Sequence, residues 1–278
     1  MPNNNIATNK LKTDHFNHHY FTHKIVVITG GAGGLATALI TQLLSFGANV
    51  AALDINVSAL VETEKLLPIA TDITSKEAIS SAIKQVIKKF NRIDVLINNA
   101  GITHMSCFKE LSSSLFEIIM AVNFTGSVEI TRQCLPYLTE SKGQIVAISS
   151  VAGFAPLYGR SAYSASKHAM EGFFRSLASE IENDGISVLV VCPSFVKSRP
   201  ELTAQVNKGL SSPGAIKKST NGEQLSPEYA AKKILQATEK RKQNLYLGKV
   251  AHIAYWLYSL LPKIYMKIMT KQAKAEFK

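Results

Sequence analysis

The sequence predicts an α/β protein built on a doubly wound, seven-stranded parallel sheet with helices on both faces. Short β-branched apolar runs alternate with longer amphipathic runs along the chain. The first apolar run leads directly into a glycine-rich turn, and 278 residues suit one large α/β domain. Strands are expected near residues 24–29, 48–53, 67–71, 93–97, 143–149, 186–191 and 244–247.

The first strand and the turn after it predict a phosphate-binding site. Residues 24–29 form a short β-branched run, which is typical of a buried parallel strand. The turn Gly30-Gly31-Ala32-Gly33-Gly34-Leu35-Ala36 follows, and residues 37–46 have helical periodicity. Glycines let the backbone approach a pyrophosphate, and the N–H groups at the start of a helix favour negative charge. A strand, turn and helix in this order therefore indicate a dinucleotide cofactor.

The second strand ends in Asp54, twenty residues after Gly34. This is the spacing expected of a carboxylate that binds the adenosine ribose hydroxyls. The same carboxylate would repel the 2′-phosphate of NADP, and the three residues after Asp54 are uncharged. The sequence therefore favours NAD over NADP. The alternative is that Asp54 only caps the end of its strand.

The later part of the chain is expected to contain two long helices, over residues 113–139 and 161–183. Ser114 and Glu117 have capping-box spacing at the start of the first helix. Ser226-Pro227-Glu228 predicts the start of a further helix, with proline at its first position. Residues 195–225 are polar and weakly periodic, and such a segment inside a compact domain is usually functional or mobile.

Tyr163 and Lys167 indicate acid–base chemistry. Four residues apart on a helix, they share one face. A fixed ammonium should favour the phenolate and lower the pKa of the tyrosine, as a proton donor and acceptor requires. Ser150 precedes Tyr163 by thirteen residues and is placed to hold a substrate oxygen. Its neighbour Ser149 would point to the opposite face of the strand.

Together these motifs make the chain resemble the short-chain dehydrogenase/reductase (SDR) family from about Lys24 to Gly248. Thr29-Gly30-x-x-x-Gly34-x-Ala36 is similar to the family's cofactor loop, with alanine in place of the third glycine. Asn98-Asn99-Ala100-Gly101 is similar to the family's Asn-Asn-Ala-Gly segment, and Asp72 to the aspartate near the adenine ring. After the sixth strand the family usually has Pro-Gly and then threonine, whereas this chain has Pro193-Ser194 and no matching threonine.

The resemblance implies a Rossmann fold, reversible alcohol–carbonyl interconversion and a catalytic set of Asn123, Ser150, Tyr163 and Lys167. In this set Tyr163 moves the proton, Ser150 holds the substrate oxygen and Lys167 binds the nicotinamide ribose. Asn123 is expected to hold a water that links Lys167 to solvent. The implied cofactor-binding residues are Gly30, Gly33, Gly34, Leu35, Asp54, Asp72, Ile73, Asn99, Ala100, Gly101, Tyr163, Lys167, Pro193 and Val196.

The substrate is expected to be a lipophilic alcohol or its ketone, such as a steroid, retinoid or fatty chain. Apolar residues near the catalytic motifs support this expectation, although the same residues could be ordinary core. The expected substrate contacts are Ser150, Phe154, Tyr158, Tyr163 and Phe195. The resemblance also implies a substrate lid within 195–225, for which a surface loop is the alternative, and a homodimer or homotetramer. Two other functions remain open: an NADPH-dependent carbonyl reductase and a non-catalytic, cofactor-binding regulatory protein.

The domain is expected to span residues 23–249, after a polar and flexible extension over residues 1–22. This extension has no apolar run that fits a secretory signal. Its histidines have no cysteine or carboxylate partners in the sequence pattern, so no metal site is expected. The three cysteines have no paired spacing, which favours a reducing compartment and a cytoplasmic location.

The C-terminal tail, residues 250–278, is basic and amphipathic. The net charge is +11, and residues 228–278 hold eleven Lys or Arg against three Glu. The apolar part of the tail is too short and too broken for a membrane span. It suits either a helix in a membrane interface or a helix packed on the protein or a partner subunit. Nucleic acid is not expected, because no recognised binding motif is present and the tail is too apolar.

Overall fold

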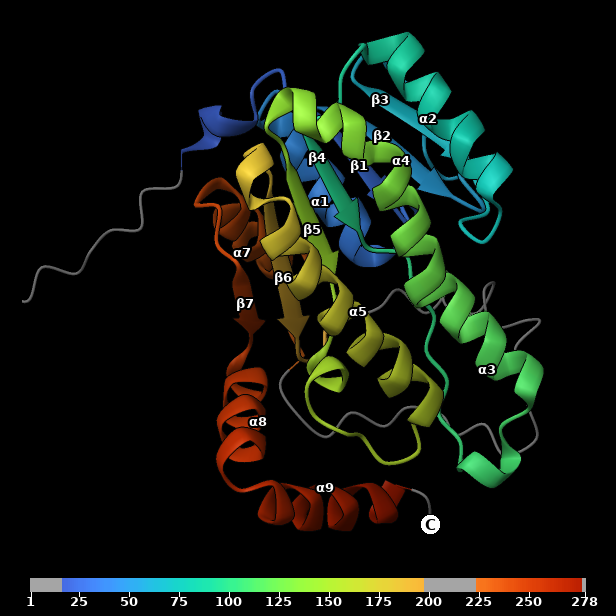
Figure 1. Ribbon diagram of the computed structural model, residues 1–278, viewed down its shortest axis with the longest axis vertical. Coiled ribbons are helices and arrows are strands. Elements are labelled where there is room, and N and C mark those ends of the chain that lie inside the picture. The colour runs from blue at the N-terminus through green and yellow to red at the C-terminus, as the bar shows by residue number, and fades with distance from the viewer. Residues whose placement is uncertain (1–16, 198–223, 277–278) are drawn as a thin grey trace, which may run out of the picture.

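The computed structural model describes residues 17–197 and 224–276. Seven parallel strands form one sheet in the order β3-β2-β1-β4-β5-β6-β7 (Figure 1). The winding reverses between β1 and β4, where doubly wound sheets bind ligands. The strands are β1 (Ile25–Thr29), β2 (Asn49–Asp54), β3 (Leu66–Ala70), β4 (Val95–Asn98), β5 (Gln144–Ile148), β6 (Ser187–Pro193) and β7 (Asn244–Leu247). The predicted fold class is therefore confirmed, with strands close to their predicted positions.

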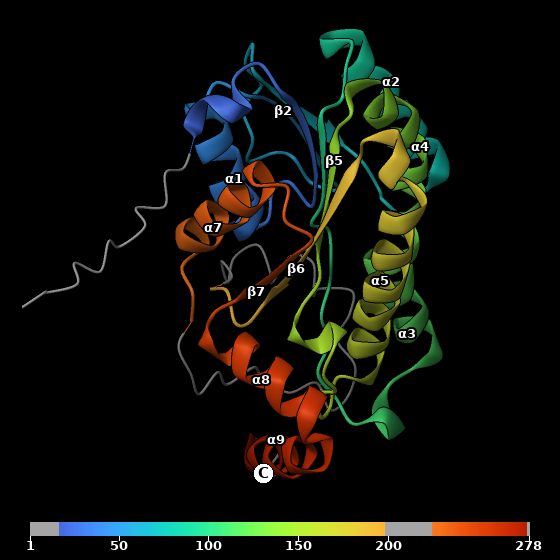
Figure 2. The same ribbon diagram turned by 60° about the vertical axis from the view of Figure 1, so that its left-hand side comes forward.

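Helices cover both faces of the sheet (Figure 2). One face carries α1 (Gly34–Ser45) and α7 (Pro227–Glu239), and the other carries α2 (Lys76–Phe90), α4 (Gly126–Ser141) and α5 (Ser161–Glu180). Successive strand residues point to opposite faces, so β1 contributes to both layers of the core. Its Val26 and Ile28 pack with α1 and α7, whereas Ile25 and Val27 pack with the other helices.

The first of the two predicted long helices is divided by a π turn. It comprises α3 (Ser113–Met120), the π turn Ala121–Thr125, and then α4. The predicted capping box at its start is wrong, because Ser112 is the N-cap and accepts a hydrogen bond from the Leu115 amide at 3.2 Å. The predicted start of α7 is confirmed, because Ser226 accepts a hydrogen bond from the Tyr229 amide at 3.1 Å.

The end of the predicted N-terminal extension belongs to the folded domain. Residues 1–16 lie outside the described part, but His18–Phe21 form a 3₁₀ helix. Phe21 is fully buried and stacks on Phe46, and the Tyr20 hydroxyl donates to Gln144 Oε1 at 2.6 Å. The prediction of a flexible stretch over 1–22 is therefore wrong for these last residues, because Phe21 is buried in the core and Tyr20 packs against it.

Two further helices, α8 (Lys249–Leu260) and α9 (Pro262–Glu276), lie beyond the carboxyl ends of the strands (Figures 1 and 2). Among the described residues no helix is both long and apolar enough to cross a membrane. Most of the predicted lid, residues 198–223, lies outside the described residues. Its two flanks pair with each other, because Lys197 donates to the Leu225 carbonyl and the Leu225 amide to the Phe195 carbonyl.

Candidate active site

The glycine turn between β1 and α1 has the form of a phosphate cradle. Gly30 has a φ of +64°, in the left-handed region that favours glycine. A Cβ on Gly31 would lie 2.8 Å from the Cβ of Ala52, so a side chain does not fit there. Gly33 is the N-cap of α1 and provides no side-chain hydrogen bond to its first amides. The amides of Gly31 and Gly33 donate to carbonyls within the protein, so the donors offered to an anionic group are the first amides of α1.

Two aspartates lie at the ends of the neighbouring strands β2 and β3, Asp54 as the last residue of β2 and Asp72 two residues after β3. Asp54 Oδ2 accepts a hydrogen bond from the Ala32 amide at 3.0 Å, and Oδ1 accepts one from Asn56 at 3.1 Å. The Asp54 carboxylate is thereby held against the glycine turn. Asp72 Oδ1 accepts from both the amide and the hydroxyl of Thr74, at 2.8 and 2.7 Å. Ile73, the next predicted cofactor residue, packs directly on the start of α4.

Side-chain hydrogen bonds join the ends of β1 and β4, where the winding reverses. Thr29 Oγ1 accepts from the amides of Asn99 and Ala100, both at 3.0 Å. Asn99 Nδ2 donates to the carbonyls of Thr29 and Gly30 at 3.1 Å. The next residue, Gly101, lies beside Lys167, because a Cβ there would be 3.6 Å from Lys167 Nζ. The predicted cofactor residues of β1 and β4 thus meet at one place.

Asn123 lies in the π turn, fully buried. Its Oδ1 accepts from the Ile102 amide at 2.8 Å. Its Nδ2 donates to the Ile102 carbonyl at 3.0 Å and to Ser166 Oγ at 2.9 Å. The Asn123 side chain therefore joins the loop after β4 to α5, close to Lys167. Its role toward a bound water remains a prediction.

The structure brings Ser150 to Tyr163. Ser150 precedes a 3₁₀ turn, Val151–Gly153, and its Oγ accepts from the Ala152 amide at 3.2 Å. The Ser150 side chain also forms a hydrogen bond with Tyr163. Ser149, in contrast, has a buried Oγ without a hydrogen-bond partner among the described residues. The thirteen-residue spacing thus selects the serine that contacts the tyrosine.

Burial raises the pKa of Tyr163 above its usual value, although the hydrogen bond with Ser150 and the charge of Arg160 oppose this effect. The expectation that Lys167 lowers this pKa is not met. Lys167 Nζ lies 5.9 Å from the centre of the Tyr163 ring and donates to the Ile148 carbonyl at 2.8 Å. Desolvation of the phenolate therefore dominates, and the phenol is protonated at neutral pH.

Lys167 is only 4% exposed, and burial lowers its pKa to about 8. The carboxylate of Glu171, one turn further along α5, opposes this shift. Glu171 accepts from Cys192 Sγ at 2.9 Å and pairs with Arg175 at 2.7 Å. Glu171 and Arg160 are not among the site residues that the sequence predicts. Their positions relative to Lys167 and Tyr163, at i+4 and i−3, are the signals that point to both.

Replacing Glu171 with glutamine should destabilise the protein by about 1–3 kcal/mol, because Arg175 loses its charged partner. The same change removes the carboxylate that favours the charged form of Lys167. Urea denaturation of the variant measures the loss, and Glu180→Gln on the exposed end of α5 is the matched control. Equal stability of Glu171→Gln and Glu180→Gln would contradict a stabilising role for the Glu171 carboxylate.

The predicted substrate residues are more dispersed. Phe154 packs edge-on against Tyr246 and Tyr255, with ring centres 5.5 and 5.6 Å apart, as part of an aromatic cluster. The Tyr158 amide contacts Met269 Sδ of α9 at 3.1 Å. At the end of β6, Pro193 is paired with β7, and the adjoining predicted residues Phe195 and Val196 pair with Leu225. Their role in substrate or cofactor binding remains a prediction.

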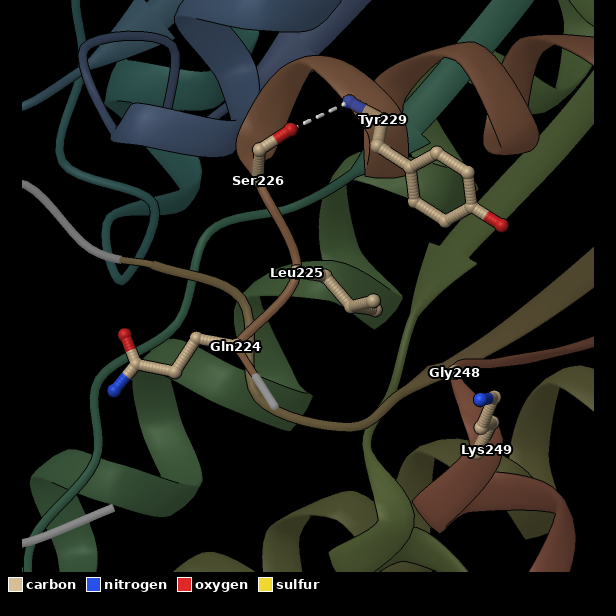
Figure 3. A pocket seen from close by; sticks show the side chains of 6 residues that line it. All are labelled: Gln224, Leu225, Ser226, Tyr229, Gly248 and Lys249. Atoms are coloured by element: carbon tan, nitrogen blue, oxygen red, sulfur yellow. Dashed lines mark hydrogen bonds between the residues drawn. The ribbon is translucent and has the colours of Figure 1, made fainter. Parts of the chain in front are cut away.

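A pocket of about 260 Å³ lies between the starts of α7 and α8 (Figure 3). It is lined by Gln224, Leu225, Ser226, Tyr229, Gly248 and Lys249. None of the predicted catalytic residues lines this pocket. The pocket is therefore distinct from the group formed by Ser150, Tyr163 and Lys167.

Comparisons with known proteins agree with this arrangement. The model of the short chain dehydrogenase family matches residues 24–210. The Anopheles gambiae protein named dehydrogenase/reductase SDR family protein 7-like is 33% identical to this chain, and the match covers 93% of this chain and 86% of that relative.

Two solved short-chain dehydrogenases share the fold at 21% identity. The Burkholderia cenocepacia structure, in complex with NADP, has a TM-score of 0.76 and covers 90% of this chain and 98% of its own. The Burkholderia phymatum structure, in complex with NAD, has a TM-score of 0.77 and covers 90% and 96%. The chain belongs to the short-chain dehydrogenase/reductase family and is an oxidoreductase that acts on CH–OH groups.

Proposed function

We propose that this protein interconverts a lipophilic alcohol and its ketone or aldehyde with NAD(H), and that Tyr163 transfers the proton. The observation that carries the proposal is the contact of Tyr163 with Ser150, with Lys167 one helical turn away. A partly buried phenol beside a hydroxyl donor and an ammonium suits proton exchange with a substrate oxygen.

When bound, a nicotinamide cofactor supplies or accepts the hydride. Ser150 Oγ donates a hydrogen bond to the substrate oxygen and orients it toward Tyr163. In carbonyl reduction the Tyr163 hydroxyl gives its proton to that oxygen, and in alcohol oxidation the phenolate takes the proton back. Because burial raises the pKa of Tyr163, the phenol is ready to donate at neutral pH. The Lys167 ammonium, beside Gly101, would hold the nicotinamide ribose.

The chain offers a fitting set of groups for the rest of the cofactor. The open amides at the start of α1 suit the pyrophosphate. Asp54 suits the two ribose hydroxyls, because its carboxylate is fixed over the glycine turn. Gly101 leaves space beside Lys167 Nζ, where the nicotinamide ribose would lie. The 2′-phosphate of NADP would meet the charge of Asp54, which supports NAD as the cofactor.

Replacing Asp54 with alanine should shift the cofactor preference toward NADP by roughly 10- to 100-fold, because it removes the repulsion between a carboxylate and a phosphate at close range. The shift is measured as the ratio of kcat/KM for NADP⁺ to that for NAD⁺. Asp184→Ala, at an exposed position after α5, is the control for a change of net charge. An unchanged ratio in Asp54→Ala would place the adenosine ribose away from this carboxylate.

The proposed reaction is tested by following NADH formation from NAD⁺ with long-chain and polycyclic alcohols, and NADH consumption with the matching ketones. We expect turnover with NAD(H) and a rate of alcohol oxidation that rises with pH, since the pKa of Tyr163 is raised. Turnover only with NADP(H) would refute the assignment of NAD(H) as the cofactor. NADH binding without turnover on any substrate would favour a non-catalytic, cofactor-binding protein instead.

A further inference from the structure

The two C-terminal helices present a set of large apolar side chains to solvent. Ile253, Trp256 and Leu260 of α8 are 64%, 61% and 69% exposed and follow one another at helical spacing. Leu261, Ile264, Met266 and Ile268 continue this exposed set onto α9. Ala251 and Ala254 of α8 and Tyr265 of α9 are instead buried together with Val151 and Ala155. The exposed set, here called the α8/α9 face, is therefore held in place by a packed inner side.

Positive charge accompanies these apolar side chains. Lys249, Lys263, Lys267 and Lys271 are all exposed. The sequence has no aspartate or glutamate between positions 249 and 275. Exposed aromatic and aliphatic side chains mixed with lysines are typical of helices that lie in a membrane interface, where the apolar groups enter the bilayer and the lysines meet anionic headgroups.

Helix α9 also contacts the segment that joins Ser150 to Tyr163. The Tyr265 hydroxyl donates to the Pro156 carbonyl at 3.2 Å, and the Tyr158 amide contacts Met269 Sδ at 3.1 Å. Both contacts fall on the loop between Ser150 and Tyr163. A surface in contact with α9 would therefore lie close to the place where substrate is expected.

We propose that the α8/α9 face binds the surface of an anionic lipid bilayer. A bilayer fits this face better than a second copy of the chain does, because pairing two such faces would bring exposed lysines together. The inference does not depend on the proposed reaction, since binding is measured without turnover. If the reaction also holds, a lipophilic substrate dissolved in the bilayer would reach the site beside α9.

The only tryptophan of the chain, Trp256, lies on the α8/α9 face and reports its environment directly. The full-length protein is titrated with vesicles of phosphatidylcholine alone and of phosphatidylcholine mixed with phosphatidylserine. We expect a blue shift of the fluorescence only with the mixed vesicles, quenching by lipids with brominated chains, and weaker binding at high salt. An unshifted spectrum with the mixed vesicles would overturn the proposal.

Matched variants separate charge from apolar contact. Lys263→Gln with Lys267→Gln should weaken vesicle binding by about 25-fold, at roughly five-fold for each lysine. Lys84→Gln with Lys88→Gln, at exposed positions of α2 with the same spacing, should not. Ile253→Ser should weaken binding by roughly ten-fold, whereas Val61→Ser, which is 77% exposed elsewhere, should not.

Two results would assign the α8/α9 face to a different occupant. Equal weakening by the α9 and α2 lysine pairs would show that net charge, and not this face, attracts the vesicles. A concentration-dependent dimer in sedimentation that Ile253→Ser abolishes, without any vesicle binding, would show that a second copy covers the face. Folding of each variant is checked by its thermal unfolding, and these surface changes should leave it unaltered.

Discussion

Replacing Tyr163 with phenylalanine is expected to lower turnover by roughly 10²- to 10⁴-fold, the range that general acid–base catalysis contributes. The change removes one hydroxyl and leaves the ring, so the packing around α5 is kept. Cofactor affinity should change little, because the phosphate cradle and Asp54 lie on other elements. The measurements are kcat with the best substrate and the NADH dissociation constant, both on the same preparation.

The control for this change is Tyr229→Phe, which alters a tyrosine on α7 away from the catalytic group. Its activity should equal that of the unaltered protein. If Tyr163→Phe kept most of the activity while Ser150→Ala lost it, the proton would have to come from another group. The assignment of Tyr163 would then be wrong, although the family and the fold would stand.

Replacing Lys167 with methionine should have opposite effects on activity and stability. Turnover should fall by about 10²-fold or more, because the nicotinamide ribose would lose the ammonium that positions it beside Gly101. Stability should rise by about 1–3 kcal/mol at neutral pH, because a buried ammonium is replaced by an apolar chain of similar length. The lost hydrogen bond to the Ile148 carbonyl offsets part of this gain.

The pH dependence of that gain follows from the direction of the pKa shift. Burial lowers the pKa of Lys167 from 10.5 to about 8. Below about 8 the ammonium is protonated in both the folded and the unfolded chain, so its burial costs the most there. Between about 8 and 10.5 the folded protein releases the proton first, and the cost is relieved as pH rises.

Urea denaturation of the unaltered protein and of Lys167→Met, at neutral pH and again within this window, measures the difference. We expect the advantage of Lys167→Met to shrink as pH rises. Lys84→Met, at an exposed position of α2, is the control and should show no such trend. A difference that stays constant with pH would mean that Lys167 titrates outside this window.

The sequence was sufficient to predict the sheet, because its central strands are buried on both faces and read as continuous apolar runs, as in Ile25–Thr29. It was also sufficient where the relevant partners are close in sequence. Tyr163 and Lys167 share a helix face at i,i+4, and the glycine turn directly follows its strand. These relations depend on local spacing alone and need no tertiary contact.

Contacts between elements that are distant in the chain could not be predicted from the sequence. Cys192 of β6 donates a hydrogen bond to Glu171 of α5, and no local sequence pattern predicts that these two residues meet. The pKa direction of Tyr163 was predicted wrongly because desolvation depends on the whole surroundings of the ring, whereas the pattern showed only Lys167. The capping box failed because several serines lie together, and backbone geometry selected Ser112.

The hydrogen bonds between the end of β1 and the Asn99 segment couple unfolding of the cofactor site to unfolding of the sheet. Four bonds join the end of β1 to the chain that follows β4. The glycine turn and the catalytic half of the sheet therefore cannot separate unless these bonds break at the centre of the molecule. Local opening of the cofactor cradle is thereby coupled to opening of the central strands. Loss of the cofactor site and loss of the fold thus become a single cooperative event.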